Sequence, residues 1–469
     1  MRRNGKVKGL NLCLAVVLIL SVIALAGCGN QGNQNAGGQP NTSNPNAGVE
    51  SDKSGDTDGK DNAEGVQASP DSGDKTILTI WGWADQAVNP MIELYEKVNP
   101  KVKMNYVTVK AEDYVQKLQT ALTADMDMPD ICMLELDYRG RLFELDCWEN
   151  LEEDPYNFDR NQYFDYANTI GTNSRGEIVA LQWDFDTAGL AYKRELAKEY
   201  FGTDDPDELH SLLPDWDAFI RKGQEVKEKS NGAVYMMPGI GDMSNILNNQ
   251  DPSPMVEGNV AKVTNTWGKT FESLVKFRDS GVVDKLVPWS PSWSASYALD
   301  QHIFYPCATW CIAGVIEPNN PDTDGRWGLM LAPEVNYTWG GTALAITSKS
   351  PNKQDAWGFL ETVLLSPEGG AISKDPIGYY SCKKSFYDDP DYVNWRPKSF
   401  GGQNVGEVLF VEGAKDLKAK PITKYDHVIR ESGNLIMQQL ENDTDMTAEQ
   451  ALEALKTEIA NRVDDLIVE

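Results

Sequence analysis

The sequence predicts an α/β protein with two domains that follows a long N-terminal leader. From about Thr76 onward, segments rich in β-branched residues alternate with segments of helical periodicity. Such alternation indicates a mostly parallel sheet covered by helices on both faces. The stretch from Thr76 to Glu469 exceeds the usual length of one domain. We therefore expect two α/β domains after the leader.

The leader begins with the features of an export signal. Arg2, Arg3, Lys6 and Lys8 precede an apolar run from Leu12 to Ala26, which is too short for a mature membrane span. The run ends in Leu25-Ala26-Gly27-Cys28, which resembles a bacterial lipobox. This resemblance implies that residues 1–27 are removed and that Cys28 is acylated.

The segment after Cys28 has the composition of a flexible tether. Residues 29–49 carry no charge and consist almost wholly of Gly, Asn, Gln, Pro, Ser and Thr, and residues 50–75 add charge but little apolar bulk. Such a chain cannot bury enough surface to offset its ordering entropy. We expect a disordered linker over 28–75, with a root-mean-square reach of roughly 40 Å.

The first part of the body alternates strands and helices. Thr76–Trp81 predicts a buried strand, and the apolar residues from Met91 to Val98 predict a helix that ends at Asn99-Pro100. Val102–Tyr106 alternates as a second strand, Tyr114–Leu122 has helical spacing, and Ile131–Leu134 is a third strand.

The remaining elements follow the same rules. Ile178–Trp183 and Leu190–Tyr192 are apolar and flank Asp184–Thr187, while Trp216–Lys229 and Trp267–Ser280 predict helices. Ala343–Thr347 predicts a strand. Ser350-Pro351 then predicts the start of a helix that runs to Leu365. Thr447 and Gln450 form a capping box for the last helix, whose predicted apolar stripe is Leu452, Leu455, Ile459, Val463 and Leu466.

Charge and cysteine content limit the class of partner. The formal charge is -28, and removal of the four cations of the signal leaves -32. Nucleic acids and anionic membrane surfaces need a basic footprint, so neither is expected as a partner. Five cysteines remain beyond Cys28, an odd number that leaves at least one thiol unpaired within the chain. We expect buried structural cysteines at Cys132, Cys147, Cys307, Cys311 and Cys382.

The order of several motifs resembles that of the family 1 extracellular solute-binding proteins, the sugar-binding receptors of ABC importers. The resemblance spans the whole mature body. It rests on Thr79-Ile80-Trp81 with Asp85, Pro129-Asp130-Ile131, Asp186 six residues before Tyr192, Trp310, Gly340-Gly341-Thr342-Ala343, Phe359–Gly369 and the terminal helix.

The resemblance implies a two-lobed periplasmic-binding-protein fold of type II, with crossover strands as hinges. One lobe would hold 76–185 plus 336–366, and the other 187–332 plus 370–469. The implied function is capture of a carbohydrate, most simply an oligosaccharide, in the interlobe cleft and its delivery to an ABC permease. The implied protein is a monomer on the outer face of the cell membrane, attached by lipid only, with no cofactor and no catalytic activity.

A sugar site needs rings for the C–H faces and acceptors for the hydroxyl groups. All thirteen tryptophans follow residue 80, and the carboxyl ends of parallel strands form the crevice of open α/β sheets. The expected ligand-binding residues are Trp83, Asp85, Glu135, Asp184, Asp186, Trp310, Trp339 and Tyr379, with Trp289 and Trp293 as weaker candidates. Trp148, Trp216 and Trp357 lie in or beside helical patterns and are expected in the core.

Other chemistries are less well supported by the sequence. Paired acids with tryptophans also fit a glycoside hydrolase, and a sugar-sensing subunit would bind its ligand in the same way. Gly268-Lys269-Thr270 lacks the earlier glycine of a phosphate loop, because Val263 occupies that position. Asn320, Asp322, Asp324 and Gly325 match a calcium loop in part, but Leu331 replaces its closing acid. No metal site is expected.

Overall fold

The structure is a computed structural model that describes residues 75–469 except 84, 125–127, 375–377 and 416. The predicted export signal, Cys28 and the linker lie outside the described residues. Within the described part, none of the helices combines the length and the apolar character that crossing a bilayer requires.

The first sheet has five strands in the order β2-β1-β3-β11-β4. Their bounds are β1 Thr76–Gly82, β2 Val102–Thr108, β3 Ile131–Glu135, β4 Leu181–Gln182 and β11 Thr342–Ile346. The strands β1, β2 and β3 are parallel, whereas β11 runs antiparallel to both β3 and β4. The four predicted strands of this region are confirmed, although only the end of the apolar run 178–183 is a strand.

The second sheet is formed around one fully buried strand, β5 (Thr187–Lys193). It pairs antiparallel with β8 (Phe304–Ala308), β9 (Trp327–Met330) and β10 (Tyr337–Thr338). A third, small sheet joins β6 (Val256–Glu257), β7 (Val260–Ala261) and β12 (Ile467–Val468).

The prediction of mostly parallel sheets is therefore wrong for the second sheet and for β4 and β11 of the first. A parallel neighbour needs a long crossover, usually a helix. The chain instead passes directly from β4 to β5 and from β10 to β11, without a helix between them. These direct connections give β11 an antiparallel place in the first sheet and β10 an antiparallel place in the second.

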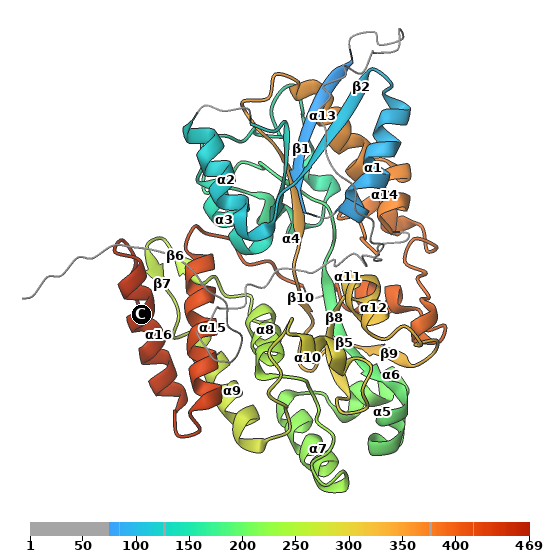
Figure 1. Cartoon of the computed structure of the whole chain (residues 1–469), viewed down its shortest axis with the longest axis vertical. Coiled ribbons are helices and arrows are strands. Elements are labelled where there is room, and N and C mark those ends of the chain that lie inside the picture. The colour runs from blue at the N-terminus through green and yellow to red at the C-terminus, as the bar shows by residue number, and fades with distance from the viewer. Residues whose placement is uncertain (1–74, 84, 125–127, 375–377, 416) are drawn as a thin grey trace, which may run out of the picture. The chain divides into compact units, whose positions relative to one another are not determined.

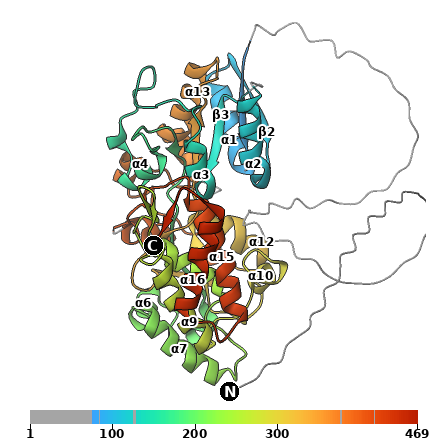
Figure 2. The same ribbon diagram turned by 90° about the vertical axis from the view of Figure 1, so that its left-hand side faces the viewer.

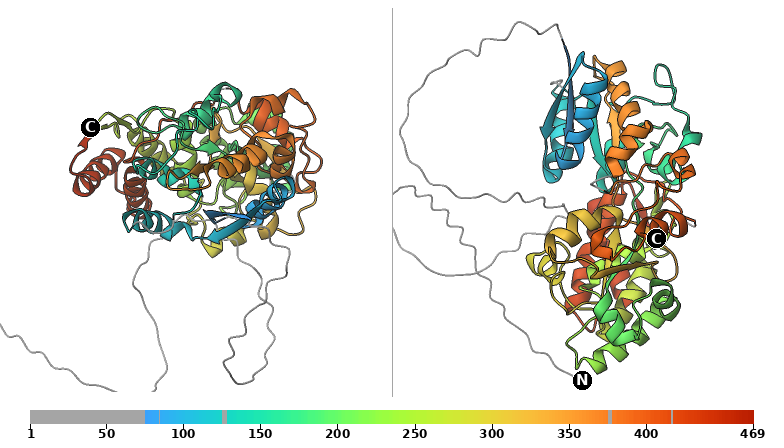
Figure 3. Two further views of the ribbon diagram at one scale, coloured as in Figure 1. Left: turned by 90° about the horizontal axis from the view of Figure 1, so that it is seen from above. Right: turned by 90° about the vertical axis from the view of Figure 1, so that its right-hand side faces the viewer.

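Both faces of the first sheet are covered, as predicted. Ile131 and Met133 belong to the apolar cluster that includes α1, whereas the alternate residues Cys132 and Leu134 belong to a second cluster with α2 and α3. Figures 1 and 3 show α1 and the orange helices beside the blue strands β1 and β2. The helices of this region are α1 Asp85–Val98, α2 Ala111–Thr123, α3 Leu136–Phe143, α4 Asp165–Gly171, α13 Lys353–Leu360 and α14 Pro367–Lys374.

The second sheet is accompanied by a larger set of helices. In Figures 1 and 2, α15 and α16 run side by side, and they pack on α9. The bounds are α5 Arg194–Phe201, α6 Pro206–Leu212, α7 Trp216–Lys229, α8 Ile240–Gln250, α9 Trp267–Ser280, α10 Pro291–Ser296, α11 Thr309–Cys311, α12 Glu317–Asn319, α15 Asp426–Asn442 and α16 Ala448–Arg462.

Two predicted helices have different ends in the structure. The helix predicted from Pro351 begins at Lys353, because Ser350 instead forms a turn in which its hydroxyl donates to Asp130 and accepts from the Asn352 N–H. The predicted capping box of Thr447 and Gln450 is present. The last helix nevertheless stops at Arg462, so Val463 and Leu466 of the predicted stripe lie beyond it.

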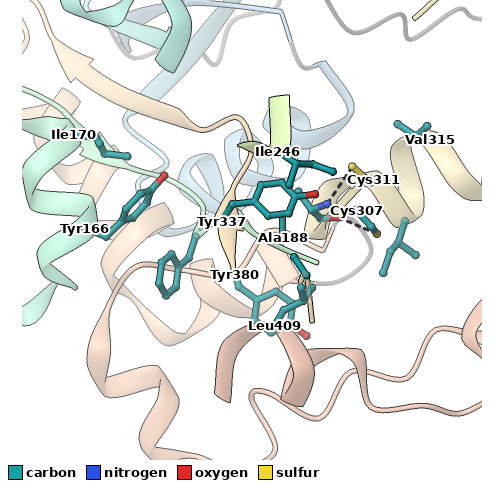
Figure 4. Close-up of a cluster of buried hydrophobic side chains, with 14 of the residues drawn as sticks. Tyr166, Ile170, Ala188, Ile246, Cys307, Cys311, Val315, Tyr337, Tyr380 and Leu409 are labelled. Carbon is teal, nitrogen blue, oxygen red and sulfur yellow. Dashed lines mark hydrogen bonds between the residues drawn. The ribbon is translucent and has the colours of Figure 1, made fainter. Parts of the chain in front are cut away.

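All five cysteines of the body are buried, as predicted, and the structure shows all five as free thiols. Cys307 and Cys311 lie among Ile246, Tyr337 and Val315 in the apolar cluster of Figure 4. There the Ala308 N–H donates to Cys311 Sγ at 3.3 Å. Trp148, Trp216 and Trp357 are buried, which confirms their prediction as core residues.

Candidate functional site

Two connections between the sheets run beside each other and form the base of the candidate site. Residues 183–186 join β4 to β5, and residues 339–341 join β10 to β11. The Trp183 N–H donates to the Thr342 carbonyl at 2.8 Å, and the Trp339 N–H donates to the Asp186 carbonyl at 3.0 Å. The predicted residues Asp184, Asp186 and Trp339 are therefore brought together.

Asp184 and Asp186 form a buried pair of carboxyl groups. Asp184 Oδ1 accepts the Thr342 N–H at 3.1 Å, and the Gln182 amide lies 3.4 Å from both Asp184 Oδ1 and Asp186 Oδ2. Asp186 Oδ1 receives no hydrogen bond from an N–H or hydroxyl group in the described part of the chain. Burial, and then the charge of Asp184, raises the pKa of Asp186 well above its usual value.

Glycine is required where the second connection passes this pair. Gly340 and Gly341 have φ values of 87° and 135°. A Cβ on Gly340 would lie 3.3 Å from Trp310 Nε1, and one on Gly341 would lie 3.0 Å from Asp186 Oδ2. The two glycines therefore let one loop touch both an indole and a carboxyl group.

Three half-buried tryptophans pack together at this loop. Trp310, at the start of α11, donates from Nε1 to the Trp339 carbonyl at 2.9 Å, and their ring centroids are 4.9 Å apart. Trp289 stacks on Trp310 at 6.0 Å with an interplanar angle of 16°, and lies 5.9 Å from Trp339. We call Trp289, Trp310 and Trp339 the tryptophan cluster. Trp289, only a weaker candidate from the sequence, is central to it.

The backbone of Trp289 is strained, and its ring packs on a residue of the core. Its φ is 68°, a region that bulky residues avoid. Its ring packs 5.1 Å from the fully buried Trp293, whose Nε1 donates to Asp242 Oδ2 at 3.1 Å. Burial raises the pKa of Asp242 to about 7. Trp293 therefore supports the cluster from the core.

The buried Asp242 gives a stability effect with a defined sign. Its folded pKa lies above its unfolded value, so stability is lost as pH rises from about 4 to 7. Asp242→Asn should remove this loss, which amounts to at most about 4 kcal/mol when the pKa rises to about 7. Urea unfolding between pH 4 and 8 measures it, with the exposed Asp279→Asn as control. Equal pH slopes for wild type and Asp242→Asn would contradict this assignment.

The remaining predicted residues lie around the ends of β1 and β3. Glu135 caps α3 by accepting the Asp137 N–H at 2.7 Å, and burial raises its pKa to about 8. Its charge also raises the pKa of Asp186, so the two acids are electrostatic neighbours. Trp83 is half-buried and meets Tyr114 and Tyr138 edge to face. The side chain of Asp85 lies outside the described part of the structure.

Tyr379 lies next to the acid pair. Its ring meets the buried Trp183 edge to face at 5.3 Å, and the charges of Asp184 and Asp186 contribute to raising its pKa. The structure thus gathers Asp184, Asp186, Trp310, Trp339 and Tyr379 around the two connections, with Glu135 close by. Trp83 packs in a separate aromatic group with α2 and α3.

A second contact between the parts of the fold that contain the two sheets lies between helices α3 and α15. Arg430 Nε lies 3.4 Å from Asp137 Oδ1, and Arg430 Nη2 donates to the Asp137 carbonyl at 3.3 Å. A Cβ built on Gly140 would lie 2.1 Å from the Thr423 carbonyl oxygen. Only glycine at position 140 therefore permits this approach of α3 to the segment that precedes α15.

The structure describes no metal centre in the ranges it covers: no group of three or more His, Cys, Asp or Glu side chains is arranged to hold an ion. In the partial calcium motif, Asn320 is buried and its Nδ2 donates to the Tyr297 carbonyl at 3.2 Å.

Two hollows in the described part of the structure lie away from the predicted residues. A groove of about 700 Å³ is lined by Arg160, α4, residues 172–174 and residues 421–425, and another of about 570 Å³ lies near Asn442 and Gln450. Neither is lined by the tryptophan cluster or the acid pair.

The arrangement of sheets and direct connections is that of the two-lobed solute-binding proteins. One similar solved structure is an extracellular solute-binding protein of family 1, at a TM-score of 0.74 and 19% identity over 82% of this chain and 99% of that one. Another is the GacH receptor of Streptomyces glaucescens, solved unliganded and with acarbose. Its TM-score is 0.67, and its sequence identity is 16% over 84% of this chain and 99% of that one. A third is the ABC-transporter-associated binding protein of B. animalis subsp. lactis, solved with β-1,6-galactobiose. Its TM-score is 0.66, and its sequence identity is 18% over 84% of this chain and 100% of that one.

The family model of the bacterial extracellular solute-binding proteins matches residues 90–397. The chain belongs to this family, and the predicted two-lobed α/β fold is confirmed. None of the curated proteins matches the sequence.

Proposed function

We propose that this protein is the carbohydrate receptor of an ABC importer and that it binds an oligosaccharide between two lobes. The lobes comprise 76–185 plus 336–366 and 187–332 plus 370–469. Family membership supports the capture of a solute. Several proteins of similar fold were solved with sugars, among them acarbose, β-1,6-galactobiose and lacto-N-biose.

The single observation that carries the proposal is the tryptophan cluster beside the buried acid pair. Three half-buried indoles offer flat apolar surface for the C–H faces of sugar rings, at little entropic cost. Asp184 and Asp186 offer acceptors for hydroxyl groups, and Asp186 Oδ1 still lacks an N–H or hydroxyl partner among the described residues. Rings and acceptors within one site suit a polyhydroxylated ligand.

Ligand binding requires the site to open. A pyranose between two parallel rings needs a separation of about 7–8 Å, since each contact takes 3.5–4.0 Å. Trp289 and Trp310 are closer than this, at 6.0 Å. A sugar that touches both lobes then stabilises the closed arrangement through its differential affinity for it.

The remaining parts of the proposal concern location, partner and chemistry. Cys28 ends a segment that resembles a lipobox, which supports export, acylation and attachment to the outer face of the membrane. The receptor acts as a monomer, hands its ligand to the permease, needs no cofactor and leaves the sugar unaltered.

A thermal-shift screen against neutral oligosaccharides tests the proposal. A ligand that binds the native state raises the melting temperature, by an amount that grows with its concentration over Kd. We expect at least one oligosaccharide to stabilise the protein and to be recovered intact. No shift with any sugar would contradict carbohydrate binding, and release of shorter sugars would show a glycoside hydrolase.

A further inference from the structure

Arg139 is a fully buried arginine that binds four separate segments of the chain. It donates to the Leu134 carbonyl from Nε at 3.2 Å and from Nη2 at 2.8 Å. Nη2 also donates to the Gly341 carbonyl at 2.8 Å, and Nη1 donates to the Ile170 carbonyl at 3.2 Å. Its position connects the end of β3, the end of α4 and the second connection between the sheets.

The fourth segment leads to the acid pair. Arg139 Nη1 donates to Gln182 Oε1 at 2.8 Å, which leaves the Gln182 amide nitrogen facing Asp184 Oδ1 and Asp186 Oδ2 at 3.4 Å. The guanidinium group of Arg139 is held by backbone carbonyl groups, and it therefore orients the Gln182 amide, which lies near both acids. Among the described residues, its hydrogen bonds go to carbonyl and amide oxygens, and none goes to either carboxyl group.

The charge of Arg139 also acts on the pair. A buried cation without a contacting carboxylate is costly, so its long-range attraction to nearby acids matters. Arg139 lowers the pKa of both Asp184 and Asp186, opposing the effect of burial. Glu135 also raises the pKa of Asp186. The charges of the acid pair in turn raise the pKa of the neighbouring Tyr166, Cys311, Tyr379 and Cys382.

We propose that Arg139, acting through Gln182, is the positioning residue of the binding site: it fixes the geometry of Asp184 and Asp186 as acceptors for the ligand. The ligand-acceptor role rests on the proposed function. The electrostatic role does not, because it acts on the folded protein without any ligand.

Stability against pH in the ligand-free protein tests the electrostatic role. Acids with raised pKa make the folded protein lose stability as pH rises. Removing the cation raises both pKa values further, so the stability that Arg139→Met loses relative to wild type, its deficit, should grow as pH rises through the range in which the pair ionises in the wild-type protein. Arg194→Met is the matched control, because Arg194 also donates to three carbonyls and to the amide oxygen of Gln403. Its deficit should stay constant over that range.

Gln182→Leu is a second variant that tests the same role if Arg139→Met does not fold. It keeps the four bonds of Arg139 to carbonyl groups but removes the shared amide, so its deficit should also grow with pH. A pH-independent deficit in both variants, or a deficit of Arg194→Met that grows equally, would overturn the proposal.

Affinity gives the second readout. For the oligosaccharide selected by thermal shift, Arg139→Met or Gln182→Leu should weaken binding about tenfold or more, and Arg194→Met should change it less than twofold. Unchanged affinity in the first two variants would overturn the positioning role. If wild type binds no sugar, the proposed function fails, while the stability measurement still decides the electrostatic role.

Discussion

Replacing Trp310 by alanine should weaken sugar binding at least about tenfold, the loss expected when an aromatic anchor is removed from a binding site. Trp310 is half-buried, contacts both other rings of the tryptophan cluster and donates to the Trp339 carbonyl. Its loss removes stacking surface and frees Trp339 to move. Titration calorimetry with the selected oligosaccharide measures the affinity, and the melting temperature should fall only slightly.

Trp357→Ala is the matched control for the loss of an indole. Trp357 lies in α13, is 7% exposed and packs 5.7 Å from Tyr156, away from the two connections. Its removal should cost about 3–5 kcal/mol of stability and leave the affinity of the folded protein unchanged. If Trp310→Ala titrates like wild type, the cluster is not the sugar site.

Gly140→Ala should weaken binding by a similar factor, for a different reason. Its Cβ would lie 2.1 Å from the Thr423 carbonyl oxygen, and a backbone atom cannot move aside like a flexible side chain. The clash opposes the approach of α3 to α15 but not the folding of either lobe. The variant should therefore favour separated lobes, which small-angle scattering detects as a larger radius of gyration without ligand.

Gly268→Ala controls for the change in helix propensity. Gly268 is also a helical glycine, but its Cβ would meet Leu452 at an ordinary 3.5 Å. This variant should match wild type in affinity and scattering, and be slightly more stable. Wild-type scattering and affinity in Gly140→Ala would show that the contact between α3 and α15 does not control closure.

The elements that the sequence predicted best carry their own end signals. The helix over 216–229 begins after Asp215, whose side chain accepts the Ala218 N–H, and the helix over 267–280 ends at Gly281 in a left-handed conformation. Both were predicted with their observed bounds. Local chemistry determines these ends, so they can be recognised without knowledge of the partners.

Sheet direction and the start of α13 depended on distant residues. β11 is antiparallel because it enters from β10 in the other sheet, which no local pattern reveals. Ser350 binds Asp130, which lies far away in the sequence. The predicted proline start of α13 was wrong because this contact holds Ser350 in a turn.

The candidate site was predicted in part. The resemblance pointed to Asp186 and Trp310, the search for aromatic rings added Trp339, and the structure brings the three residues together. Arg139 and Gln182 were missed because their partners are at positions 134, 170 and 341, which only the fold brings together. One signal was available, since Arg139 occupies the apolar face of its helix with Leu142 and Phe143.

A crystal structure of the protein with its best-binding oligosaccharide tests the central claim most directly. We predict an intact sugar that lies against Trp310 and Trp339, with a hydroxyl group bonded to Asp186. A sugar bound instead in the groove lined by residues 172–174 and 421–425, with the tryptophan cluster still closed on itself, would contradict the account.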